Sequence, residues 1–105
     1  MLYMQVTGQV MPGRLMELKK LLADELFPLF EKYGAKVVGS WQTIVGTVEE
    51  FTDLYAFDSM AHYEQVMRSM VRDPAWWPTH AKGRSLVSTE TTKFLWPLVP
   101  TEQIK

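Results

Sequence analysis

The segment 36-KVVGSWQTIVGTVEEFTDLYAF-57 decides the fold, because it holds two runs of β-type residues joined by a short connection. The first run, residues 35–45, consists largely of β-branched residues together with Trp41, and the second extends from Phe51 to Phe57. Gly46 begins the turn between them. Strands connected this closely usually pair as an antiparallel hairpin. We therefore expect a hairpin at the centre of the chain.

A helix is predicted before this hairpin, over residues 14–33. Its leucines recur at spacings of three and four residues, which places them on one apolar stripe. Pro28 lies inside this stretch and cannot donate to the carbonyl four residues earlier, so a kink or break is expected there. Gly34 suits the left-handed position that ends a helix.

Two helices are predicted after the hairpin. Asp58 or Ser59 can cap the first one, whose apolar positions recur at helical spacing. The second is expected to take Asp73 as its N-cap, with Pro74 at the first helical position, and to end at Gly83.

The two ends of the chain complete the pattern. Residues 2–11 alternate in polarity as a strand does, with Gly8 marking a bulge or a close backbone approach. Residues 86–96 return to β-type residues, among them three Thr and Val87, and form the last predicted strand. The resulting β-α-β-β-α-β order predicts an α+β, ferredoxin-like domain with a four-stranded antiparallel sheet and helices on one face. We expect the domain to span residues 1–97, followed by a tail at 98–105.

Both parities of the strand beginning at Val37 are largely apolar, so the sheet face away from the helices is expected to be apolar too. An exposed apolar sheet favours association. We therefore expect a homodimer with two-fold symmetry, the two sheets packing face to face.

Composition excludes several classes of protein. The chain has 105 residues, a net charge of -1 and no cysteine, so thiol chemistry and cysteine-ligated zinc are ruled out. The near-neutral charge predicts neither a nucleic-acid nor a membrane partner. No apolar run approaches the ~20 residues that span a bilayer, and the first residues do not resemble a signal peptide. A cytoplasmic location is expected.

Asp53 is the first candidate for chemistry. Aspartate is uncommon in strands, and this one shares its parity with Phe51, Tyr55 and Phe57. A carboxylate on an aromatic face can have a raised pKa and act as a general base. The alternative is an edge or interface aspartate bonded to a backbone N–H or an arginine.

Aromatic side chains are the candidates for a ligand-binding wall. Trp41, Tyr55, Trp76 and Trp77 could line a cavity between sheet and helices, with Gln5 and Thr43 as polar anchors. Trp76 follows the Asp-Pro helix start directly, so a structural role is expected for it. The alternative is that these rings fill the core and the dimer interface.

The chain has two histidines, His62 and His80. His80 could bind ligand, shuttle a proton or ligate a heme iron, and its alternative role is a helix-end residue that interacts with the helix dipole. No heme or other cofactor is required by the sequence. No pair of potential ligands has the spacing of a metal motif, so no metal site is expected.

Four ordered stretches resemble the NIPSNAP family of dimeric α/β-barrel domains, and together they cover residues 3–96. They are Tyr3 through Pro12-Gly13, Tyr33-Gly34-Ala35-Lys36-Val37-Val38-Gly39-Ser40-Trp41, the stretch from Gly46 to Ser59, and Asp73-Pro74-Ala75-Trp76. The resemblance implies the fold and the dimer. Related barrels include cofactor-free monooxygenases, small isomerases and heme-handling proteins, so the fold alone implies no single activity.

The main functional hypothesis is a homodimer that holds a small apolar or aromatic molecule between sheet and helices. One alternative is a cofactor-independent monooxygenase or isomerase, with Asp53 as the base and Tyr55 orienting the substrate. The other is a non-catalytic protein-interaction module with a closed interior.

Overall fold

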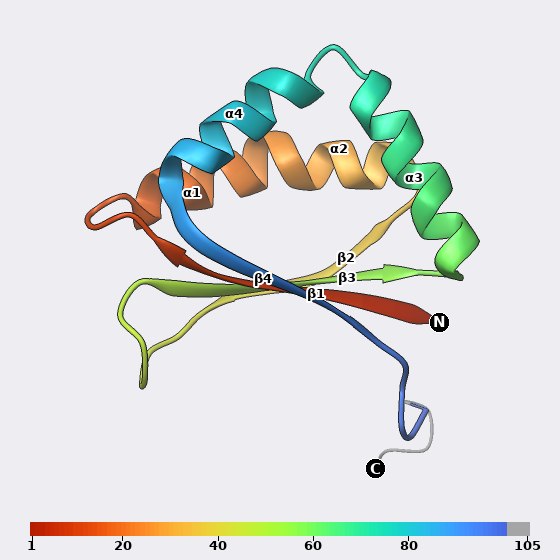
Figure 1. Cartoon of the computed structure of the whole chain (residues 1–105), viewed down its shortest axis with the longest axis horizontal. Coiled ribbons are helices and arrows are strands. Elements are labelled where there is room, and N and C mark those ends of the chain that lie inside the picture. Colours follow the sequence, from red (N-terminus) through yellow and green to blue (C-terminus); the bar gives the residue numbers. More distant parts are fainter. Residues whose placement is uncertain (101–105) are drawn as a thin grey trace.

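The computed structural model describes residues 1–100 and confirms the predicted α+β architecture. One antiparallel sheet has the strand order β2-β3-β1-β4, and all helices cover the same face of it (Figure 1). The strands are β1 (Leu2–Val10), β2 (Lys36–Gln42), β3 (Glu50–Phe57) and β4 (Val87–Leu95). Strand β2 ends three residues before the predicted limit, because the chain turns into the β2–β3 loop after Gln42.

The first helix is continuous but irregular. It consists of α1 (Leu15–Leu21), a π-helical turn η1 (Leu22–Leu26) and α2 (Phe27–Lys32), with right-handed helical backbone at both junctions. The π turn comes directly before Pro28, and the N–H of Phe27 bonds the carbonyl of Leu22, five residues earlier. The expected irregularity at Pro28 is therefore a widened turn, which lets the helix continue past a residue that has no N–H to donate.

Helix α3 (Met60–Arg72) begins as predicted, with Ser59 Oγ accepting from the N–H of His62 at 3.1 Å. Helix α4 (Trp76–Leu86) differs from the prediction at both ends. Asp73 is not its N-cap, because the Asp73 carboxylate accepts from the N–H of Ala75 within the turn before the helix, at 2.8 Å. Gly83 does not end the helix either, since its backbone is not left-handed and the helix continues for three more residues.

Asp73 joins the α3–α4 turn to the end of α2. Its carboxylate accepts from the Tyr33 hydroxyl at 2.6 Å and from Lys32 Nζ at 2.9 Å. These two donors hold the pKa of Asp73 well below its ordinary value. The anchored turn sets where α4 starts, and therefore where the side chains of its first two turns lie above the sheet.

The core lies between the sheet and the helices, and alternate residues of β1 and β3 face it. The buried members of this inner face are Leu2, Met4, Gly8, Val10, Phe51, Asp53, Tyr55 and Phe57.

Gly8 marks a close approach, as the sequence suggested. A Cβ atom there would lie 2.7 Å from the Phe51 ring and 2.8 Å from the Thr89 carbonyl oxygen. The phenyl ring thus takes the space that a side chain at position 8 would need.

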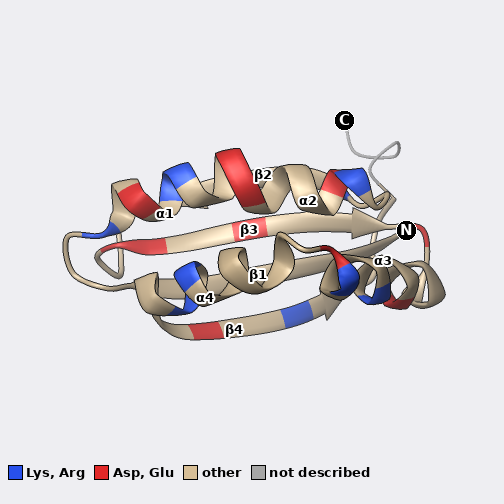
Figure 2. Ribbon diagram, turned by 90° about the horizontal axis from the view of Figure 1, so that it is seen from above, with Lys and Arg blue, Asp and Glu red and all other residues tan. Residues whose placement is uncertain are grey.

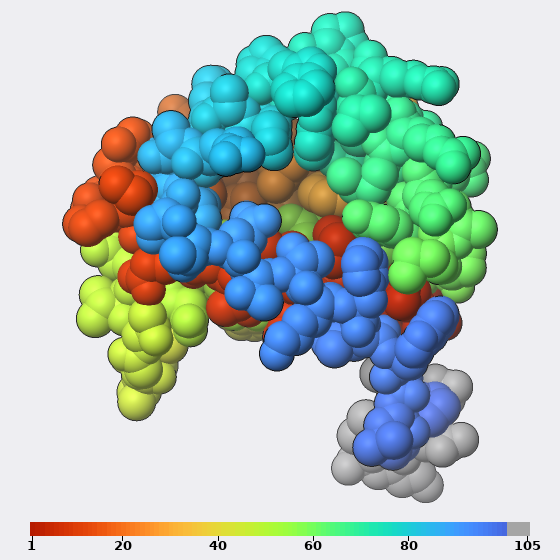
Figure 3. Space-filling view, in the orientation of Figure 1, coloured from red at the N-terminus to blue at the C-terminus, as the bar shows by residue number. Residues whose placement is uncertain are grey.

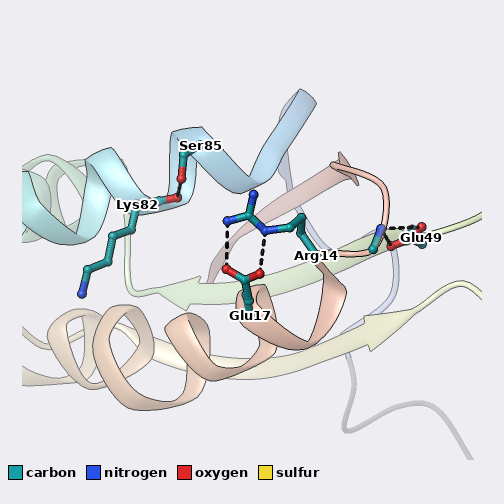
Figure 4. Close-up of polar contacts among 6 residues, drawn as sticks. Arg14, Glu17, Glu49, Lys82 and Ser85 are labelled. Atoms are coloured by element: carbon teal, nitrogen blue, oxygen red, sulfur yellow. Dashed lines mark hydrogen bonds and ion pairs between the residues drawn. The ribbon is translucent and has the colours of Figure 1, made fainter.

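Charged residues gather on the helices and are few on the strands (Figure 2). At the β1–α1 turn, Arg14 and Glu17 form a two-bond ion pair, and the Glu49 carboxylate accepts from the N–H of Gly13 at 3.0 Å (Figure 4). Over residues 1–100, no helix combines the length and apolar character needed to cross a bilayer.

Candidate functional site

A hollow of about 510 Å³ lies between the inner face of the sheet and the helices. Residues of every helix and of strands β1, β3 and β4 line it. In the space-filling view the surface is hollowed between α4 and β4, and orange-brown atoms of the first helix are visible at depth (Figure 3). The apolar stripe of that first helix therefore covers the core and also forms part of a cavity wall.

Asp53 lies at the floor of this cavity. It is 1% exposed, and it stands opposite Val6 of β1 and Ser40 of β2 in the sheet register. Because paired residues share a face, Ser40 also points inward, and its hydroxyl donates to Asp53 Oδ1 at 2.5 Å. The edge strand β2 thus supplies a hydrogen bond to the most buried charge of the site.

The surroundings of Asp53 shift its proton affinity. Burial is the main cause that raises the pKa of Asp53 to about 6. Interactions with the Ser40 and Tyr55 hydroxyls partly offset this rise, and the nearby negative charge of Glu90 adds to it. Burial likewise raises the pKa of Tyr55 far above its ordinary value. Tyr55 therefore stays a neutral donor, while Asp53 changes charge just below neutral pH.

Aromatic rings form much of the wall. Tyr55 packs on Phe30 with ring centroids 4.2 Å apart, and Trp76 stacks on His80 at 5.2 Å with the planes 17° apart. Tyr63 of α3 completes this side of the cavity. A concave site with aromatic walls and few polar groups is typical of small-molecule binding.

Charged side chains enter the cavity from two elements besides β3. Glu90 of β4 pairs with Gly8, which puts it on the inner face, and Arg84 and His80 come from α4. Among residues 1–100, neither Asp53 nor Glu90 has a basic nitrogen within ion-pair distance.

The structure brings three of the predicted site residues together and leaves four elsewhere. Asp53, Tyr55 and His80 line the cavity. The other four do not line it. Gln5 and Trp41 belong to the outer face of the sheet. Thr43 lies in the loop after β2, where its hydroxyl donates to Glu50 at 2.8 Å, and Trp77 is 66% exposed on α4.

Sequence reasoning missed Ser40, Glu90 and Arg84 as members of this site, and it assigned Trp76 a structural role although the ring lines the cavity. Trp76 precedes His80 by four residues, and that spacing alone could have placed both on one helix face. The inward direction of Ser40 follows from the pairing of β2 with β3, which includes a register shift between Val37 and Gly39. Glu90 likewise depends on the pairing of β4 with β1.

The described part of the chain has no cluster of three or more His, Asp and Glu side chains arranged to hold a metal ion. His80, considered above as a heme ligand, lies with its ring stacked against Trp76.

Comparison with known proteins adds a family and a set of shared folds. The sequence profile of the NIPSNAP family matches residues 6–100. An uncharacterised NIPSNAP domain protein from Burkholderia xenovorans superimposes with a TM-score of 0.86 at 24% identity, covering 95% of this chain and 99% of that one. A NIPSNAP family protein of unknown function from Agrobacterium tumefaciens gives 0.84 at 23% identity, over 92% and 87%.

A putative antibiotic biosynthesis monooxygenase from Bacteroides thetaiotaomicron is also similar, with a TM-score of 0.72 at 17% identity over 99% of this chain and 95% of that one. At these identities the structural likeness shows the fold alone. No curated protein matches the sequence.

The raised pKa of Asp53 predicts a pH-dependent cost to stability. The folded protein binds this proton more tightly than the unfolded chain, so the contribution of Asp53 to the free energy of unfolding falls as pH rises from 4 to 6 and is constant above that. The free energy of unfolding that is lost through Asp53 over this pH range is on the order of 3 kcal/mol. Asp53→Asn removes the buried charge, so we expect the variant to unfold at higher urea concentration than the wild type at pH 7.5, by about 1–3 kcal/mol.

Urea unfolding of both proteins at pH 7.5 and pH 4.5 measures this difference, which is expected to shrink at the lower pH. Asp24→Asn, at an exposed position of the first helix, is the matched control and should behave as the wild type at both pH values. An Asp53→Asn protein less stable than the wild type at pH 7.5 would contradict the prediction.

Proposed function

The chain belongs to the NIPSNAP family, and we propose that it binds a small apolar or aromatic molecule in the cavity between the sheet and the helices. The observation that carries the proposal is the buried carboxylate of Asp53 at the floor of an otherwise largely apolar hollow of about 510 Å³. Its volume lies within the range of small-molecule sites, roughly 300–1,000 Å³.

Packing physics supports this reading over that of an interaction module with a closed interior. Protein cores are packed about as densely as organic crystals, and few of their voids exceed the size of a water molecule. A buried carboxylate without a basic partner also costs free energy in a purely structural core. A bound ligand would fill the void and would interact with the carboxylate, so it would offset both unfavourable features.

Binding can be tested with small aromatic compounds by protein NMR. We expect the indole N–H signal of Trp76, which lines the cavity, to shift on addition, while those of the exposed Trp77 and Trp96 stay in place. Thr92→Trp places a bulky ring at an exposed position on the cavity rim and should weaken binding by about tenfold or more, since it occupies the same space.

Ala81→Trp is the matched control, because it adds the same ring to an exposed position of α4 outside the cavity lining. Equal binding by both variants would show that the compounds bind elsewhere, and the proposal would then fail.

Asp53 supports a second candidate function, proton removal from a bound carbon acid. A general base works best when its pKa is near the working pH, and the pKa of Asp53 is raised to about 6. The neutral Tyr55 hydroxyl, two residues along the same strand face, is placed to orient the substrate. The product would be an isomer or, with molecular oxygen as co-substrate, a ketone: the activated CH2 loses both hydrogens and gains one oxygen atom, and the second oxygen atom leaves as water.

Deuterium exchange at the acidic C–H of 1-phenyl-1,3-butanedione, followed by proton NMR, measures this activity. We expect a protein-catalysed rate that rises with pH through about 6 and then levels off, as Asp53 loses its proton. Asp53→Asn should lower the rate by a factor of about 100 or more. An unchanged rate in the variant would exclude Asp53 as the base.

We also propose that the working unit is a homodimer joined through the outer face of the sheet. Within residues 1–100 no helix covers this face (Figure 1), and Trp41 on it is 54% exposed. Leu95 and Trp96 add further exposed apolar surface at the end of β4. An uncovered sheet face with large apolar side chains favours pairing with a second sheet.

Sedimentation equilibrium at micromolar concentration should give twice the 12.2 kDa chain mass. Trp41→Glu is expected to shift the protein to monomers, because it introduces a charge into the interface. Trp77→Glu changes an equally large exposed ring on the helical side and should remain dimeric. A monomeric wild type would refute the proposal.

A further inference from the structure

The side chains that line the cavity include more carboxylates than guanidinium groups. Two carboxylates, Asp53 and Glu90, line it against one guanidinium, that of Arg84. Neither carboxylate has a basic partner within ion-pair distance among residues 1–100. Asp53 is the most enclosed of the three, and its polar contact is the Ser40 hydroxyl at 2.5 Å. A buried carboxylate is ordinarily compensated by a cation, and residues 1–100 place no such cation within ion-pair distance of Asp53.

The walls around these carboxylates are suited to a cation as well. Tyr63 and Trp76 line the cavity from α3 and α4, and Tyr55 and Phe30 do so from β3 and α2. The faces of such rings carry negative partial charge and attract ammonium groups, more strongly where water is displaced. Aromatic walls and acidic side chains in one pocket together form a common recognition site for organic cations.

We propose that the cavity receives a protonated amine carried on an aromatic or aliphatic body, with the Asp53 carboxylate as its principal counter-ion. This inference rests on the proposed ligand-binding function. Glu90, on the strand that flanks β1 on its other side, adds negative potential near the opening. The apolar body lies against the leucine stripe of the first helix, whose members Leu18, Leu22 and Leu26 line the cavity. A bound ammonium makes Asp53 a binding group and not a base.

Neutral and anionic ligands fit the same volume less well. A neutral molecule can bury its apolar surface but leaves the Asp53 charge uncompensated. An anion can meet Arg84, yet it must enter beside two carboxylates, and like charges at close range are unfavourable. Shape alone therefore does not select the ligand, whereas charge does.

Three compounds of similar size and different charge test the inference: 2-phenylethylamine, 2-phenylethanol and 3-phenylpropionate. Titration followed at the Trp76 indole N–H should show the amine binding at least about tenfold more tightly than the alcohol, with the carboxylate weakest. Asp53→Asn should reduce the affinity for the amine by about tenfold and leave that for the alcohol unchanged. Glu90→Gln should have a smaller effect in the same direction, and Asp24→Asn should have none.

The pH dependence gives a second readout. The titratable and charged groups that face the cavity are Asp53 and Tyr55 from β3, Glu90 from β4, Tyr63 from α3, and His80 and Arg84 from α4. Because the pKa of Asp53 is raised to about 6, the affinity for the amine should fall as pH is lowered from 7.5 to 5, while that for the alcohol stays constant. In the Asp53→Asn variant this loss should be greatly reduced.

The outcomes separate this inference from the function on which it rests. If the alcohol or the carboxylate binds as tightly as the amine, or if the preference for the amine survives in Asp53→Asn, the cavity is a ligand site but not an amine site. If none of the three compounds shifts the Trp76 signal at millimolar concentration, both the ligand-binding proposal and the amine proposal are overturned.

Discussion

The register between β1 and β3 is the constraint on which the rest of the molecule depends. It sets Val6 opposite Asp53 and Met4 opposite Tyr55, and it directs all four side chains toward the helices. Because side chains alternate along a strand, a shift by one residue would move this whole set to the outer face. Gly8 takes part in the same constraint, since its missing side chain leaves room for the Phe51 ring. The register between β1 and β3 thus positions the residues of both the core and the candidate site.

Above the sheet, the helices follow paths that leave a cavity. The first helix continues past Pro28 through a π turn, and two residues of that turn, Leu22 and Leu26, face the cavity. Helix α4 starts where it does because Asp73 ties the preceding turn to Lys32 and Tyr33. Such irregular turns are frequent at functional sites. Here the irregular turn lines the hollow itself, and the anchored turn directly precedes Trp76, which also lines it.

The buried Asp53 carboxylate lowers the stability of the fold and supplies the charged group of the candidate site. Its raised pKa means that the folded state bears a cost for keeping this group ionised at neutral pH, and the hydroxyls of Ser40 and Tyr55 only partly offset that cost. Groups that lower stability while being held in a defined geometry are typical of sites that act on a ligand. An asparagine would fit the same hydrogen bonds without the charge, so packing alone does not account for the aspartate.

Local pattern in the sequence determined the order of helices and strands, the one-sided helical layer and the unusual position of Asp53, because periodicity and residue parity are properties of neighbours along the chain. Only the tertiary structure decided which residues meet around that carboxylate. Ser40 and Glu90 face it through strand pairings that include a shifted register in β2, whereas Gln5 and Trp41 face away. Trp76 faces the cavity and Trp77 does not, because the anchored turn at Asp73 sets the rotation of α4. Contacts between residues far apart in sequence depend on register and helix rotation, and neither is recorded in local composition.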